Sequence, residues 1–92
     1  MRKEVFYRRK FLNKRKGKAL IETGLEVYGD PEDKNFDAIL SITDCNRSVS
    51  LELWSRFKDK ADVTNCLFKL DTLLDEIGNL RGRIQNELDK EE

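Results

Sequence analysis

The chain has 92 residues, of which 39% are charged and 38% are hydrophobic, so it can bury one modest core and can hardly form a deep catalytic cleft. Histidine is absent, which removes the commonest general base and the commonest metal ligand. No apolar run is long enough to span a membrane, and no apolar segment follows the basic N-terminus as in a secretory signal. We therefore expect a cytoplasmic protein with one small domain over 1–92.

Charge is divided unevenly along the chain, although the formal net charge is zero. Residues 1–18 carry nine basic side chains and one acid, a net charge of +8, and the remaining residues carry nine basic and seventeen acidic side chains, a net charge of −8. Such a distribution favours charged macromolecular partners over a small substrate.

The first two segments are predicted to be strands joined by the basic loop 13–18. Residues 5–12 are rich in Val, Phe and Tyr, which favour a strand, but neither face alternates cleanly and a short helix is the alternative. Residues 19–28 alternate clearly, and a turn-rich loop, 29–35, follows them. One face of this second strand carries Ala19, Ile21, Thr23, Leu25 and Val27.

The next two segments predict a β-hairpin. Residues 36–43 and 48–54 each alternate apolar and polar side chains, and the turn-forming residues 44–47 lie between them. The apolar positions are Phe36, Ala38, Leu40 and Ile42 in the first strand and Val49, Leu51 and Leu53 in the second.

The last segment predicts an amphipathic helix from about residue 62 to about residue 89. Its apolar positions recur at alternating spacings of three and four. Asp59 and Asp62 are candidate N-caps. Gly78 and Gly82 lie inside the helix, and because the apolar phase continues through Gly78 we predict one continuous helix; the alternative is an end at Gly78. The stripe consists of Val63, Cys66, Leu70, Leu73, Ile77, Leu80 and Ile84, widened by Leu67, Leu74 and Leu88.

Together these segments predict an α+β fold of order β-β-β-β-α. A four-stranded antiparallel β-meander with a basic N-terminal hairpin occupies 1–58, and one long amphipathic helix occupies 59–92. A helix of about 28 residues spans about 40 Å, whereas a strand of about seven residues spans about 23 Å, so the helix should overhang the sheet. The overhanging half suits pairing with a second copy in a homodimer, or alternatively it covers its own domain. The predicted self-association residues are Ile77, Leu80, Ile84 and Leu88.

No pattern in the sequence predicts a catalytic site, a metal site or a cofactor. Cys66 lies on the apolar stripe and Cys45 in the predicted hairpin turn, and neither has a base pattern nearby that would activate a thiolate. Two cysteines without histidine do not complete a zinc site, and we expect them to be reduced thiols, the alternative being a disulfide. The acids from Asp33 onward resemble the start of a calcium loop, but Ala38 replaces its obligatory glycine.

The basic N-terminal segment is the candidate nucleic-acid-binding region. Its basic side chains alternate with Phe6, Tyr7 and Phe11, a combination used by proteins that bind single strands. Alternatively the aromatic residues belong to the core, the basic residues protect an edge strand, or they neutralise acids of the same dimer. The candidate phosphate-contacting residues are Arg8, Arg9, Lys10, Lys14, Arg15 and Lys16.

The sequence thus favours a small, non-enzymatic interaction protein that docks a charged surface onto a larger protein or ribonucleoprotein as an inhibitor or adaptor. In size, charge and its self-associating helix it resembles, in general style, the small regulators encoded by phages and other mobile elements. The alternative is direct binding of DNA or RNA through the basic N-terminal hairpin.

Overall fold

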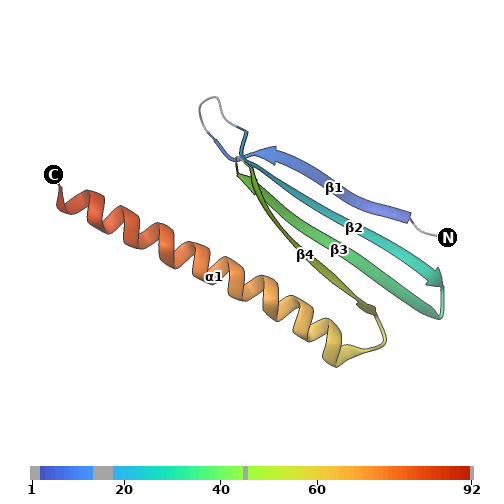
Figure 1. Cartoon of the computed structure of the whole chain (residues 1–92). Helices are drawn as coiled ribbons and strands as arrows, with labels where there is room; N and C mark the ends of the chain where they lie inside the picture. Colours follow the sequence, from blue (N-terminus) through green and yellow to red (C-terminus); the bar gives the residue numbers. More distant parts are fainter. Residues whose placement is uncertain (1–2, 14–17, 45, 92) are drawn as a thin grey trace.

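Four antiparallel strands and one C-terminal helix make up the computed structural model, which describes residues 3–13, 18–44 and 46–91 (Figure 1). The strands lie in the order β1-β2-β3-β4, so each pairs with its neighbour in the sequence. This confirms the predicted α+β meander followed by a helix. Cys45 lies outside the described residues. The elements are β1 (Lys3–Phe11), β2 (Leu20–Asp30), β3 (Asp33–Asp44), β4 (Arg47–Arg56) and α1 (Lys60–Lys90).

The first segment is an edge strand with a bulge at Val5. Glu4 pairs with Glu26 and Phe6 pairs with the adjacent Leu25, so Val5 has no opposite residue in β2. A bulge shifts the alternation of side chains by one position. The bulge therefore places Lys3 on the same face as Phe6, whereas the mixed pattern after Phe6 continues in regular register with β2.

The register of the other strands places their apolar side chains on one face of the sheet. Leu25 lies opposite Ala38, which in turn lies opposite Leu53, and directly opposite residues point to the same side. We call this side the apolar face. Its other members in β2 to β4 are Ile21, Thr23, Val27, Phe36, Leu40, Ile42, Val49 and Leu51, and Phe6, Arg8 and Lys10 of β1 lie in register with it.

Helix α1 begins at an aspartate cap and continues without interruption through Gly78. The Asp59 carboxylate accepts a hydrogen bond of 3.1 Å from the backbone N–H of Asp62, which satisfies one of the unpaired donors of the first turn. Asp62 also places a negative charge at the positive end of the helix dipole. The predicted continuous helix is therefore confirmed.

The core lies where the first turns of α1 meet the sheet. Phe36, Leu53 and Cys66 are buried together, and the partly buried residues around them come from both layers. Helix α1 lies closest to β4 and then diverges from the sheet, so that the two layers form an open wedge (Figure 1). The partly buried residues packed on this core are Leu25, Ala38, Leu51, Val63 and Leu70.

The strands are longer than predicted, but α1 still extends past one end of the sheet, as expected (Figure 1). β3 has 12 residues and spans about 40 Å, whereas α1 has 31 residues and spans about 46 Å. The two layers are therefore of similar length. The molecule is 58 Å long, however, so the two layers are offset. The second half of α1 is uncovered both because it diverges from the sheet and because its last turns extend past the end of the sheet (Figure 1).

Candidate interaction surfaces

The wedge between the apolar face and α1 contains an open apolar groove of about 380 Å³. Residues of both layers line it, including Leu25 and Phe36 from the sheet and Val63 and Leu67 from the helix. Among the described residues of the lining, only Thr23 carries a hydroxyl group. The groove can thus bind an apolar surface, but it offers little for polar recognition.

The helix wall of the wedge is the stripe that contains the predicted self-association residues. The same side of α1 that buries Cys66 and half-buries Leu70 continues with large apolar side chains that are 37–69% exposed. Helical periodicity places them on one side, because residues three or four positions apart are neighbours. We call this set the distal stripe: Leu73, Leu74, Ile77, Leu80, Ile84 and Leu88.

The sheet wall is the end of the apolar face toward the β3–β4 turn, which lies away from the start of α1 (Figure 1). There Val49 is 64% exposed, and its cross-strand neighbour Ile42 is only half-buried. Ile21 continues the wall onto β2, opposite Ile42. The sequence placed these residues at the apolar positions of the predicted strands, and it is the divergence of α1 that leaves them uncovered.

The total surface area shows that the single chain exposes more surface than a compact monomer of its mass. Its accessible surface is 8199 Å², whereas a folded monomer of 10.8 kDa exposes about 5,500 Å². The radius of gyration is 17.0 Å, against about 12 Å for a single domain of this length. The chain therefore carries a surplus of about 2,700 Å² of exposed surface relative to such a monomer.

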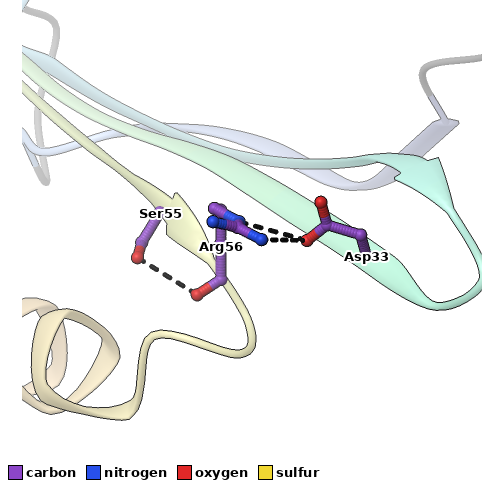
Figure 2. A network of polar contacts seen from close by, with 3 residues as sticks. All are labelled: Asp33, Ser55 and Arg56. Carbon is purple, nitrogen blue, oxygen red and sulfur yellow. Dashed lines mark hydrogen bonds and ion pairs between the residues drawn. The ribbon is translucent and has the colours of Figure 1, made fainter.

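The closed end of the wedge is held by contacts between β3, β4 and the connection to α1. Both Nε and Nη2 of Arg56 lie 3.1 Å from Oδ1 of Asp33, and the Ser55 hydroxyl donates to the Arg56 carbonyl at 3.2 Å (Figure 2). The Phe57 ring packs 5.1 Å from the ring of Phe36. Because the ion pair is largely exposed, the packing of Phe57 contributes more to fixing the direction of α1.

The basic residues that the structure describes are divided between the two faces of β1. Arg8 and Lys10 lie in register with the apolar face, and the Arg8 guanidinium is 5.8 Å from the centre of the Phe6 ring. Arg9 points to the opposite face, where it lies across from Glu22. All three are exposed, but they do not form one patch. The candidate phosphate-contacting residues Lys14, Arg15 and Lys16 lie outside the described residues.

The opposite face of the sheet, which we call the polar face, is rich in acids and also carries the exposed aromatic side chains of Trp54 and Tyr7. Trp54 is 67% exposed and pairs across the strands with Asp37. The Tyr7 hydroxyl donates a hydrogen bond to the Glu22 carboxylate, and this bond raises the pKa of Tyr7 above its ordinary value. The acids in register on this face are Glu4, Glu22, Glu26, Asp37 and Glu52.

The described residues offer no arrangement typical of a metal site. No group of three or more His, Cys, Asp or Glu side chains within them is placed to hold a metal ion. Cys66 is a free, buried thiol in the core. None of the helical residues described forms a segment long and apolar enough to cross a membrane.

Comparison with protein-family models, with curated proteins and with solved structures gave no match to this chain.

Proposed function

We propose that the chain is a cytoplasmic, non-enzymatic interaction protein that docks onto a larger protein or ribonucleoprotein as an inhibitor or adaptor. The observation that carries this proposal is the surplus of exposed surface on a chain of 92 residues, together with the large apolar side chains exposed along the distal stripe. Apolar patches of more than a few hundred Å² are typical of surfaces that another macromolecule covers.

Self-association through α1 is part of this proposal. Ile77, Leu80, Ile84 and Leu88 are all more than half exposed and share one side of the helix. Pairing with a second copy would bury these four side chains and leave the charged surfaces free to contact the larger protein or ribonucleoprotein. Isologous pairing is the commonest way in which a single chain completes such a surface.

The polar face is the surface that we propose for docking. Trp54 is 67% exposed on a strand surface whose neighbours include Glu52 and Asp37, so it would anchor the contact while acids surround it. Exposed tryptophans are among the residues that contribute most to protein interfaces, and an acidic surround selects a basic partner surface. The expected partner is therefore a protein with a basic surface, including one that ordinarily holds nucleic acid.

The test is affinity capture from the native host followed by reconstitution with the purified candidate partner. Trp54→Ala should raise the Kd at least about thirtyfold, as expected for loss of an interface anchor. Ser50→Ala, on the same strand and the same face, is the matched control and should leave the Kd within about twofold. Reconstituted complexes with equal Kd for wild type and Trp54→Ala would contradict docking through the polar face.

Direct nucleic-acid binding is the second candidate, and one observation favours it. Every described residue of β1 is exposed, so Arg8, Arg9 and Lys10 are all accessible to phosphate groups. Binding of this kind weakens steeply with salt, because each neutralised phosphate releases counterions. A mobility-shift titration at low salt with Arg8→Gln, Lys10→Gln and wild type tests it. The absence of any shift by the wild-type protein at low salt would rule this candidate out.

A further inference from the structure

We propose that the wedge holds helix α1 of a second copy, so that the distal stripe of each chain packs on the apolar face of the other. This inference rests on the self-association proposed above and specifies its geometry. Pairing of helix with helix alone is the other geometry, and it would leave the sheet wall exposed.

The width of the distal stripe indicates contact with more than one surface. At 3.6 residues per turn, Leu74 and Leu80 lie about 120° apart around the helix axis. The seam of a two-stranded coiled coil is narrower than this, whereas a stripe of 100° or more is typical of a helix that faces a core. The distal stripe is therefore wide enough to contact a partner helix and a sheet at once.

The width of the sheet indicates room for two helices. Four strands spaced about 4.8 Å apart span about 14 Å between the outer strand axes, whereas a helix with its side chains is about 10 Å wide. One helix cannot cover such a face. Because α1 lies closest to β4 at its start and then diverges, the uncovered part comprises β1 and β2, where Ile21 and Phe6 lie, and the end of β4 at Val49. A second helix placed there would complete the layer.

The edges of the two surfaces carry opposite charges. Arg8 and Lys10 are exposed at the β1 edge of the apolar face. The distal half of α1 carries Asp89 on one flank of its stripe and Glu76 and Glu87 on the other, with Arg81 within the stripe. A partner helix over β1 and β2 would bring one of these acidic flanks beside the two basic side chains. The two-fold symmetry of a homodimer makes the same contact twice.

The surplus of exposed surface area also agrees with a homodimer of this geometry. The surplus of about 2,700 Å² per chain is close to the upper range for obligate homodimers, which bury about 1,000–2,500 Å² or more on each partner. When α1 of each chain packs on the sheet of the other, both the helix wall and the sheet wall of each wedge are covered. Pairing of the two helices alone covers only the helix wall in each chain.

The experiment compares charge substitutions on the two faces of β4, in the full chain, by sedimentation equilibrium. Val49→Arg places a charge on the sheet wall, where the side chain is 64% exposed in the single chain, so the chain itself should still fold. We expect its dimer Kd to rise at least about a hundredfold, because the assembly would bury an unpaired charge. Ser50→Arg, the adjacent residue on the polar face, is the matched control and should leave the dimer intact. Circular dichroism checks that both variants retain their helix and strands.

The outcomes separate this inference from the proposed function. If Ile84→Asp is monomeric while Val49→Arg stays dimeric, the chains pair through their helices alone and the exchange is wrong, although self-association stands. A monomeric wild-type protein overturns both the exchange and the homodimer, but it leaves docking onto another protein untouched.

A photo-crosslinking residue at position 84, in mixed isotope-labelled and unlabelled chains, gives an independent readout. The exchange predicts crosslinks between chains from α1 to the apolar face of the other chain's sheet. Crosslinks within one chain to its own sheet would overturn it, and position 68, on the far side of the helix, is the control.

Discussion

The sharpest difference between the single chain and an assembled protein is expected at Ile84. In the single chain this side chain is 62% exposed, so it loses little buried surface when it is truncated. Complete burial of an isoleucine contributes about 2–5 kcal/mol relative to alanine, and alanine also favours the helix by a few tenths of a kcal/mol. For an isolated chain we therefore expect Ile84→Ala to lower the free energy of unfolding by at most about 1 kcal/mol.

If a second copy covers the distal stripe, Ile84→Ala should lower the free energy of unfolding by about 2–5 kcal/mol per chain. Phe68→Ala is the matched control, since Phe68 is 66% exposed but lies two positions after Cys66, about 200° around the helix from it. Phe68→Ala should change the free energy of unfolding little, whether or not a second copy covers the distal stripe. Leu53→Ala is the reference for a residue that the chain buries by itself, at 4% exposure, and should cost about 2–5 kcal/mol.

The assay is urea unfolding followed by circular dichroism at two protein concentrations a hundredfold apart. Dimer formation should stabilise the more concentrated sample by about 2.7 kcal/mol per dimer, or about 1.4 kcal/mol per chain, by mass action. Equal, small effects of Ile84→Ala and Phe68→Ala, with midpoints that do not depend on concentration, would refute the idea that the distal stripe is covered.

Three further predictions concern single residues. Asp59→Ala removes the cap of α1 and should lower the free energy of unfolding by about 1 kcal/mol in urea denaturation. Gly78→Ala should raise it by about 1 kcal/mol, because a Cβ there meets no atom within 4 Å; a loss of stability instead would indicate close packing on Gly78 in the assembled protein. Absorbance titration of tyrosine should show that Glu22→Gln lowers the pKa of Tyr7, which its hydrogen bond to Glu22 holds above 10.0. Since the folded pKa is the raised one, this bond stabilises the fold below about pH 10 and is lost as pH rises through the folded pKa.

The order and type of the elements were predictable because their signals are local. Side-chain alternation identified β2, β3 and β4, and the spacing of apolar residues identified α1 through Gly78. The strand ends were not predictable in this way. The β2–β3 ladder continues through Asn35, Lys34 and Asp33, because backbone hydrogen bonds do not require apolar side chains.

The candidate surfaces were predictable only in part. The distal stripe follows from helical spacing, and the sequence identified Ile77, Leu80, Ile84 and Leu88. The open sheet wall was missed, because the direction of α1 depends on how Phe57 packs on Phe36, and no local pattern encodes that contact. The width of a four-stranded sheet relative to one helix is the signal that would have found it.

The meander also has a consequence for the rate at which the protein reaches its final state. Because each strand pairs with its neighbour in the sequence, the sheet contacts span short stretches of chain, and such contacts form quickly. With a second copy in the wedge, completion of the fold requires an encounter between two partly folded chains. Refolding should then show a fast phase that is independent of concentration and a slow phase that accelerates in proportion to protein concentration. The time needed to mature would thus depend on how much of the protein a cell makes.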